Sequence, residues 1–270
     1  MNQPFLSASL LCVWMFTAAP SHEAPARSVA VPTSAASAAP GPNIFDGTLH
    51  DNDAVPELST TALRDALNDP RVVVLDARPY DEFAKSHIPA ARSVPGVPGL
   101  TASKYTSDAN EVKKLVPETN RPLIVYCNGL YCGRSKRFAA DLKKLGYRNV
   151  RRYQLGIPAW RALGGVTQVE KDALVSLLAS DSTAVLVDAR PTKDATPRLP
   201  RARWIPPSEA TKAKDDGRLP MSDHNTRIFV VADDPDRARA AAEAIIRDAF
   251  HNVSFFAGSA AELAALLAKP

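Results

Sequence analysis

The sequence predicts an α/β fold built from two tandem copies of one unit, each a parallel sheet flanked by helices, after a disordered N-terminal leader. Three observations predict it: apolar β-branched runs alternate with amphipathic segments, four blocks recur in the same order, and residues 27–56 show neither helical nor strand periodicity. Strands that alternate with helices are typical of a parallel sheet covered on both faces. A chain of 270 residues with 45% hydrophobic residues can form two such domains.

The first unit is expected to span residues 57–165. Its two continuous apolar runs, VVVL at 72–75 and LIVY at 123–126, are typical of strands buried on both faces. The remaining elements expected here are, in chain order, a helix through residue 68 with N-cap candidates at 59–61, helices over 81–85, 135–145 and 157–163, and a strand over 149–153.

The second unit, expected over residues 166–270, repeats the first from a boundary near Gly164–Gly165. AVLVDAR at 184–190 repeats VVVLDAR at 72–78, and LPRARWIP at 199–206 repeats IPAARSVP at 88–95. RIFVVA at 227–232 repeats the second strand, and FHNV at 250–253 repeats YRNV at 147–150. The unit opens with Thr-x-x-Glu at 167–170, which reads as a capping box for a helix through residue 179.

The N-terminal 26 residues read as a signal peptide and residues 27–56 as an Ala/Pro/Ser-rich linker. The uncharged apolar stretch at 5–19 is short for a membrane span, and Ala24-Pro25-Ala26 offers small residues for cleavage. No Lys or Arg precedes that stretch, so an uncleaved anchor or a disordered start are the alternatives. We expect export to the periplasm, with no stable membrane insertion after the segment is removed.

Charge and cysteine content argue against a nucleic-acid partner, a disulfide framework and a structural zinc site. The net charge of +4 is spread along the chain without a run of five Lys or Arg residues, so we expect no nucleic-acid partner. After loss of Cys12, only Cys127 and Cys132 remain. Two cysteines are too few for a disulfide framework or a structural zinc site, so we expect local thiol chemistry and no metal.

Seven short motifs cover most of residues 57–165. The motifs are Leu75-Asp76-Ala77-Arg78, Tyr80-Asp81-Glu82-Phe83, His87-Ile88-Pro89-Ala90-Ala91, Tyr126-Cys127-Asn128-Gly129, Arg134-Ser135, Gly146-Tyr147-Arg148-Asn149-Val150 and Gly156-Ile157-Pro158-Ala159-Trp160. In this order they resemble the rhodanese (thiosulfate sulfurtransferase) family, which more often has glycine in place of Ser86 and Ala90.

Cys127 follows a buried strand and precedes a helix expected to begin around Arg134-Ser135. Inward backbone N–H groups and the helix N-terminus would lower the pKa of its thiol. Arg134, and with less specificity Lys136 and Arg137, could hold an anionic donor. Taken without the motifs around it, Cys127 would read as a small buried hydrophobe.

The resemblance implies that Cys127 takes the outer sulfur of a donor such as thiosulfate, becomes a persulfide, and passes the sulfur to a thiol or cyanide. It implies no cofactor. The residues then expected to bind the donor or the persulfide are Asn128, Gly129, Leu130, Tyr131, Cys132, Gly133, Arg134 and Ser135.

Cys132 lies in a loop that reads as two residues longer than the family's, because Arg134 and Ser135 come seven and eight residues after Cys127 rather than five and six. Three roles for Cys132 stay open. It could attack a Cys127 persulfide to form a disulfide, serve as an alternative nucleophile, or fill space.

Asp76 and Arg78 recur as Asp188 and Arg190 in a unit without a cysteine, which favours a structural ion pair over a catalytic role. We likewise expect structural roles for His87, whose counterpart is Arg198, and for Trp160.

The second unit is expected to be catalytically silent. Ala232 stands at the cysteine position, Arg237 follows at a five-residue offset as though the loop length were retained, and three Asp residues would repel anions. We expect this unit to cover the first and to shape the mouth of the site between them.

An exported sulfurtransferase is the leading functional hypothesis. The alternatives are a non-enzymatic persulfide-carrying or partner-binding module and a dithiol redox protein that uses Cys127 and Cys132. Phosphatase or arsenate reductase chemistry would need an arginine six residues after the cysteine, and here the arginine comes at seven.

Overall fold

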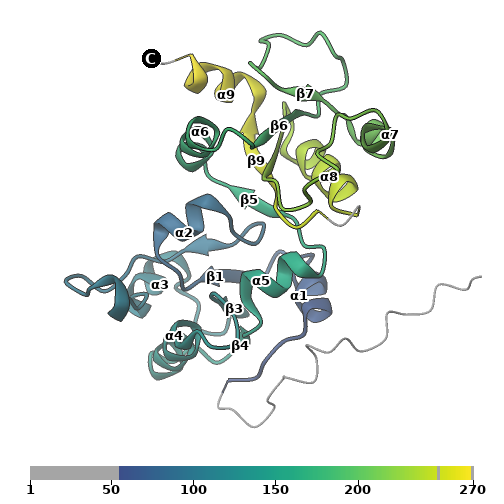
Figure 1. The fold of residues 1–270 in the computed structure, drawn as a ribbon. Coiled ribbons are helices and arrows are strands. Elements are labelled where there is room, and N and C mark those ends of the chain that lie inside the picture. Colours follow the sequence, from purple (N-terminus) through teal and green to yellow (C-terminus); the bar gives the residue numbers. More distant parts are fainter. Residues whose placement is uncertain (1–54, 248–249, 269–270) are drawn as a thin grey trace, which may run out of the picture. The chain divides into compact units, whose positions relative to one another are not determined.

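The computed structural model describes residues 55–247 and 250–268 (Figure 1). The predicted signal peptide and nearly all of the predicted linker lie outside these residues. Val55 is already buried in the core, and the Pro56 carbonyl accepts a hydrogen bond from the Arg152 N–H at 2.9 Å. Packing therefore begins two residues before the expected start of the first unit at residue 57. Within the described residues, no helix combines the length and hydropathy needed to cross a bilayer.

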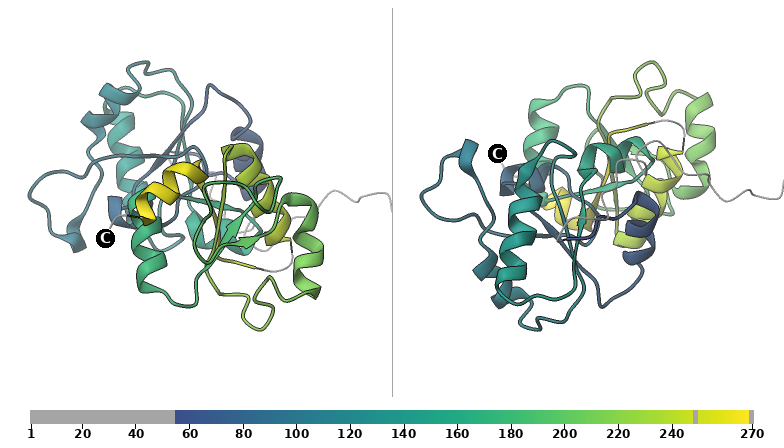
Figure 2. Two further views of the ribbon diagram at one scale, coloured as in Figure 1. Left: turned by 90° about the horizontal axis from the view of Figure 1, so that it is seen from above. Right: turned by 90° about the horizontal axis from the view of Figure 1, so that it is seen from below.

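The first unit holds a four-stranded parallel sheet in the order β2-β1-β3-β4. Its helices cover both faces (Figure 2). The elements are, in chain order, α1 (Thr60–Ala66), β1 (Val73–Asp76), α2 (Tyr80–Lys85), β2 (Arg92–Ser93), the 3₁₀ helix η2 (Ala102–Lys104), α3 (Ala109–Leu115), β3 (Leu123–Tyr126), α4 (Gly133–Lys144), β4 (Val150–Tyr153) and α5 (Gly156–Ala162).

Alternation along the strands divides the core of this unit into two layers. Leu75 and Val125 point to the face covered by α3 and α4, where Phe138 packs. Val74 and Ile124 point to the opposite face, covered by α1, α2 and α5. Because both faces of β1 and β3 are buried, these strands are apolar almost throughout, which is why the sequence shows them as continuous runs.

The second unit holds a five-stranded parallel sheet in the order β5-β9-β8-β6-β7. Its faces are covered by α7 and α8 on one side and by α6 and α9 on the other. The elements are, in chain order, β5 (Thr167–Val169), α6 (Lys171–Ser180), β6 (Val185–Asp188), β7 (Arg203–Trp204), the 3₁₀ helix η3 (Pro207–Glu209), α7 (Ala210–Asp215), β8 (Ile228–Ala232), α8 (Pro235–Ile246), β9 (Val253–Ser259) and α9 (Ala260–Leu267).

The predicted fold of two tandem α/β units is confirmed, and the strand register shows the repeat. Asp76 is paired with Tyr126 in the first sheet, and Asp188 is paired with Val231 in the second. The residue that follows Val231 is Ala232, so it occupies the place of Cys127. The second unit has no helix matching α2 within its described residues.

The capping box predicted at residues 167–170 is wrong. Residues 167–169 form strand β5, which pairs with β9, and α6 begins at Lys171 with Glu170 as an N-cap that makes no side-chain capping bond. The Thr167 hydroxyl lies 2.6 Å from Ser254 Oγ in the sheet instead. Pairing with a strand almost ninety residues away thus overrides the local pattern.

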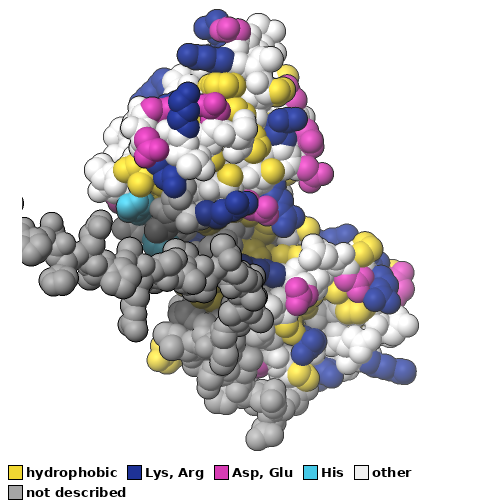
Figure 3. Space-filling model, turned by 90° about the vertical axis from the view of Figure 1, so that its right-hand side faces the viewer, with side chains coloured by type: hydrophobic (Ala, Val, Ile, Leu, Met, Phe, Trp, Pro, Cys, Tyr) yellow, Lys and Arg dark blue, Asp and Glu magenta, His cyan; other side chains and the backbone are white. Residues whose placement is uncertain are grey.

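Charged side chains are mixed over the described part of the face shown in Figure 3. Lys and Arg side chains alternate there with Asp and Glu side chains and do not form one continuous basic area.

Candidate active site

The loop between β3 and α4 carries both cysteines. β3 ends at Tyr126, and α4 begins at Gly133, one to two residues before the expected start around Arg134-Ser135. Cys132 is therefore the N-cap residue of α4 and not simply the far end of a loop. The first N–H groups of a helix have no partner within it, so Cys132 stands where hydrogen-bond donors are in excess.

Two glycines shape this loop. Gly129 has φ +109°, a left-handed conformation that favours glycine. Gly156, at the start of α5, has φ +64°, and a Cβ there would lie 2.2 Å from the Cys127 carbonyl oxygen and 2.4 Å from the Gly129 nitrogen. The Ile157 N–H donates to that Cys127 carbonyl at 3.2 Å. The loop is therefore held against α5 at a distance that only glycine permits.

Cys127 is fully buried. Its Sγ lies 3.2 Å from the Cys132 carbonyl oxygen and 3.2 Å from Ser135 Oγ. The expected lowering of its pKa is wrong: the hydrogen bond to the Cys132 side chain and, after it, burial raise the pKa of the Cys127 thiol well above its ordinary value. The hydroxyl and N–H of Ser135 oppose this rise only in part. Cys127 is thus a protonated thiol with no solvent access in this conformation.

Cys132 is half-buried, and its pKa is shifted in the opposite direction from that of Cys127. The hydrogen bond from Cys127 lowers the pKa of Cys132 to about 5, and the N–H groups of Asn128 and Arg134 with the Arg134 charge add to this against the effect of burial. The N–H groups expected to serve Cys127 are divided between the two sulfur atoms: those of Asn128 and Arg134 stabilise Cys132, and that of Ser135 acts on Cys127. Together the two residues form a thiolate–thiol pair at the N-terminus of a twelve-residue helix.

The tip of the loop faces solvent. Leu130 is exposed, and Tyr131 is fully exposed. Gly133 is the first residue of α4, and Ser135 is buried against Cys127. Of the residues expected to bind donor or persulfide, the structure thus gathers Asn128, Cys132, Arg134 and Ser135 around the sulfur atoms, while residues 130 and 131 point away.

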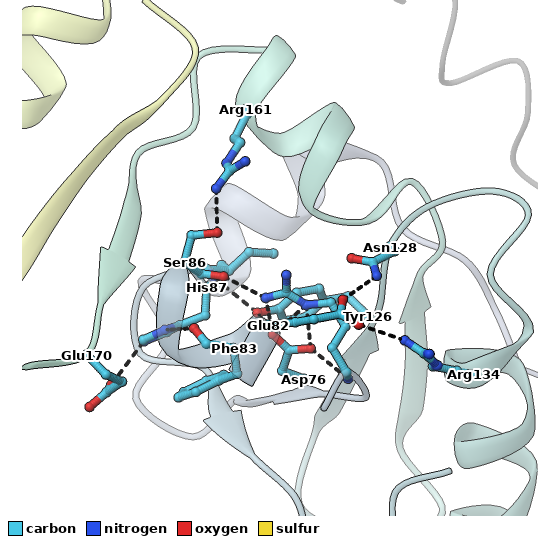
Figure 4. A network of polar contacts seen from close by, with 12 residues as sticks. Asp76, Glu82, Phe83, Ser86, His87, Tyr126, Asn128, Arg134, Arg161 and Glu170 are labelled. Atoms are coloured by element: carbon cyan, nitrogen blue, oxygen red, sulfur yellow. Dashed lines mark hydrogen bonds and ion pairs between the residues drawn. The ribbon is translucent and has the colours of Figure 1, made fainter. Parts of the chain in front are cut away.

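Arg134 is engaged by a carboxylate that the sequence did not single out as part of the site. Its Nη1 donates to Glu82 Oε1 at 3.1 Å, and the other carboxylate oxygen of Glu82 accepts from Asn128 Nδ2 at 2.5 Å (Figure 4). The guanidinium also lies 5.7 Å from the Tyr105 ring centre. Glu82 therefore links α2 to the loop of residues 127–132, called the sulfur loop below, and to the first turn of α4. Both partners are distant in the chain, so the sequence alone did not indicate this role.

Lys136 and Arg137, the less specific candidates for the donor, are both exposed on α4. Arg137 Nε lies 3.5 Å from Thr106 Oγ1.

Asp76 and Arg78 form a buried ion pair beneath the loop. Arg78 Nε donates to Asp76 Oδ1 at 2.9 Å and its Nη2 donates to Asp76 Oδ2 at 2.6 Å. The Tyr126 hydroxyl donates to the same carboxylate, and Arg78 Nη2 also donates to the Ser86 carbonyl (Figure 4). The pair joins the ends of β1 and β3 to the segment after α2 and does not touch either cysteine.

His87 and Trp160 also lie away from the sulfur atoms. Trp160 is buried, and its Nε1 donates to the Val166 carbonyl at 2.8 Å. The His87 ring stacks on Phe83 at 3.8 Å, and burial lowers the pKa of His87 to about 4. A neutral imidazole 3.6 Å from Glu170 forms no ion pair at neutral pH.

The corresponding loop of the second unit is shorter than that of the first. α8 begins at Pro235, three residues after Ala232, whereas α4 begins six residues after Cys127. This difference has the direction that the arginine offsets indicate, five residues to Arg237 against seven to Arg134, although Arg237 itself lies inside the helix. Asp234 caps α8 by accepting from the Asp236 N–H at 3.1 Å. Ala232 is buried and offers no sulfur at the position that matches Cys127.

Comparison with protein families finds one match in each unit. The rhodanese-like domain family matches residues 59–163 and 170–266. Among solved structures, a thiosulfate sulfurtransferase from Pseudomonas aeruginosa is 21% identical, with 77% of this chain and 42% of that one covered and a TM-score of 0.34. The Escherichia coli protein SseA, a 3-mercaptopyruvate sulfotransferase, is 20% identical over 75% of this chain and 98% of its own, with a TM-score of 0.31. A search of curated proteins gave no match.

Proposed function

Because this chain belongs to the rhodanese-like domain family, we propose that it transfers sulfane sulfur from a small anionic donor such as thiosulfate to a thiol or cyanide. The observation that carries the proposal is the thiolate–thiol pair of Cys132 and Cys127 at the N-terminus of α4. A thiolate is the form of cysteine that attacks sulfur, and amide N–H groups stabilise the charge that forms there.

Accessibility favours Cys132 as the first nucleophile and Cys127 as the place where the sulfur rests. The Cys132 thiolate attacks the outer sulfur of thiosulfate, the S–S bond of the donor breaks, and sulfite leaves with the bonding electron pair. Cys127 then attacks the same outer sulfur, and its proton passes to the Cys132 sulfur with which it is hydrogen-bonded, so that Cys132 leaves as a thiol. The acceptor then takes the sulfur from Cys127, which leaves as a thiolate; because Cys127 is buried, residues 128–131 of the loop must move aside for this step. Two half-reactions of this kind give ping-pong kinetics.

Intact mass after exposure to thiosulfate tests the proposal. The wild-type protein gains about 32 Da, the mass of one sulfur atom, on one cysteine. Cys132→Ser loads sulfur far more slowly, whereas Cys127→Ser loads it on Cys132 and turns over poorly. Loading of the Cys127→Ser, Cys132→Ser double variant at the wild-type rate would reject the site. A stable persulfide without turnover by any small acceptor would favour the carrier function.

The contact between the two side chains favours one second candidate, dithiol redox chemistry. If Cys127 attacks the inner sulfur of a Cys132 persulfide, a Cys127–Cys132 disulfide forms and hydrosulfide leaves. A protein or small dithiol must then reduce the disulfide. Release of hydrosulfide with a loss of two thiols per molecule would establish this route, and full turnover of Cys132→Ser would exclude it.

We also propose that the chain is exported to the periplasm, which the apolar stretch at 5–19 and the small residues at 24–26 support. The mature protein then begins at Arg27, as N-terminal sequencing would show. Recovery of the uncleaved chain in the membrane fraction would instead indicate an anchor.

A further inference from the structure

A cavity lies beside the sulfur loop, and neither cysteine lines it. It has a volume of about 370 Å³ and receives residues from both units. Outside its lining, backbone hydrogen bonds join the first unit to strand β5: the His87 N–H donates to the Gln168 carbonyl at 2.9 Å, and the Gln168 N–H donates to the His87 carbonyl at 2.8 Å. Of the sulfur loop, only Asn128 reaches this cavity. It is therefore separate from the place where a donor would meet Cys132.

Positive charge dominates the lining. Arg78, Lys85, Arg161 and Arg227 line the cavity, against the single carboxylate of Glu82. That carboxylate is already held by side chains of the sulfur loop, so it does not neutralise the cavity.

Three of the four cations have carboxylate partners outside the lining. Those ion pairs are Arg78 with Asp76 at 2.6 Å, Arg227 with Asp181 at 2.8 Å, and Lys85 with Asp81 at 3.9 Å.

Arg161 has no such partner. Its Nη2 donates to Ser86 Oγ (Figure 4), while its Nε is buried without a hydrogen-bond partner. Within residues 55–247 and 250–268, no carboxylate forms an ion pair with it. Burial, Arg78 and Arg227 lower its pKa to about 10. It remains charged at neutral pH, so α5 places an uncompensated guanidinium in a cavity that other cations share. Such a charge is costly to bury unless an anion joins it.

We propose that this cavity binds a small oxyanion with at least two negative charges, with Arg161 as its principal ligand and Arg227 as a second. Guanidinium groups present paired N–H donors that match the oxygens of sulfate, phosphate or a dicarboxylate. The free Nε of Arg161 supplies one of those donors. The site does not depend on sulfur transfer, because neither cysteine lines it.

Thermal unfolding in low-millimolar sodium sulfate, against sodium chloride at equal ionic strength, tests the site. An anion that binds only the folded protein raises the unfolding temperature in a saturable way. Arg161→Gln should weaken the apparent affinity by about tenfold or more, since charged hydrogen bonds are lost. Arg151→Gln, which removes an exposed arginine of β4 with the same change in charge, is the matched control and should behave as the wild type. The Cys127→Ser, Cys132→Ser double variant should bind sulfate normally.

Two outcomes overturn the proposal. One is an equal response to sulfate in the wild type and Arg161→Gln, which would make the effect a general one of the salt. The other is a marked loss of stability of Arg161→Gln in chloride alone, which would make Arg161 a structural residue. The proposal requires that this variant, without sulfate, unfold at the wild-type temperature or above it, because an uncompensated charge has been removed.

Discussion

The two strand–loop–helix junctions of this chain begin from the same place in their sheets and end differently. In the first unit six residues, 127–132, join β3 to α4, whereas in the second the last residue of β8 and two aspartates precede α8. The first junction leaves helix N–H groups to serve sulfur, while the second uses the Asp234 carboxylate as its own cap. The two units thus share one fold. The first differs at this junction by a loop three residues longer, and that loop carries the two cysteines.

The largest loss of stability is expected from substitutions in the buried Asp–Arg ion pairs, which the two units share. Asp76→Asn leaves Arg78 buried without its counter-charge and should lower the free energy of unfolding by about 3–5 kcal/mol. Asp188→Asn should cost about 1 kcal/mol less, because Val231 replaces Tyr126 and one hydrogen bond to the carboxylate is absent. Urea unfolding of both variants measures the difference, and a greater loss for Asp188→Asn would contradict the network described here.

His87 should give the first unit a pH-dependent stability that the second lacks. Its pKa is about 4 in the folded protein and near 6.5 when unfolded, so the unfolded chain binds the extra proton between these values. Stability is full above pH 6.5 and falls by about 3 kcal/mol as the pH drops to 4.

The variant His87→Gln isolates this contribution from the carboxylates that titrate in the same range. The difference in unfolding free energy between wild type and His87→Gln should change between pH 6.5 and 4. Arg198→Gln, at the matching position with a side chain 78% exposed, serves as the control and should show no such change. A flat difference for both variants would refute the low pKa of His87.

Alkylation by iodoacetamide should separate the two cysteines by pH. The rate at Cys132 should rise through about pH 5 and level off above it, whereas Cys127 should stay unmodified until far higher pH. At pH 6.5 Cys132 should react only a few-fold faster than an ordinary thiol, because a lower pKa also reduces nucleophilicity. The pH at which the alkylation rate of Cys132 reaches half its maximum is therefore diagnostic, and the rate itself is not. A half-maximum near pH 8.5 would refute the lowered pKa of Cys132.

The smallest change in sulfur loading and in stability is expected from placing a cysteine in the second unit. Ala232→Cys puts a thiol at the position of Cys127, but it is buried and the adjacent helix is capped by a carboxylate. We expect no sulfur loading by intact mass and a stability change of about 1 kcal/mol or less. Loading at residue 232 would show that the longer loop is dispensable.

The fold could be predicted from the sequence because its signals are local and repeated. The buried runs, the duplicated VDAR-type motif and the glycine at 146 each constrain one element independently of the rest. The capping box at 167–170 failed for the opposite reason, since β9 competes for the same residues and lies far away in the chain.

The site could be predicted only in outline. Its residues were found, because cysteines, arginine and serine between a strand and a helix are visible in order. The sequence did not indicate which of the two thiols has the lowered pKa. Cys127 and Cys132 lie near the same few backbone N–H groups, and the residue at which α4 begins decides which N–H groups lie nearest to each sulfur. Glu82 was missed as a site residue because its partners are 46 and 52 residues away.

The N-cap position of Cys132 also makes the first turn of α4 a reporter of its chemical state. Although Cys132 makes no regular side-chain capping bond, the Arg134 N–H in the first turn stabilises the negative charge on its sulfur. Capping the sulfur with a neutral adduct removes that acceptor, so amide protons near Gly133 should exchange with solvent faster while those deeper in the helix are unchanged. Fraying of this helix end would thus register alkylation of Cys132, whereas a persulfide, whose outer sulfur keeps a negative charge, should disturb the first turn less.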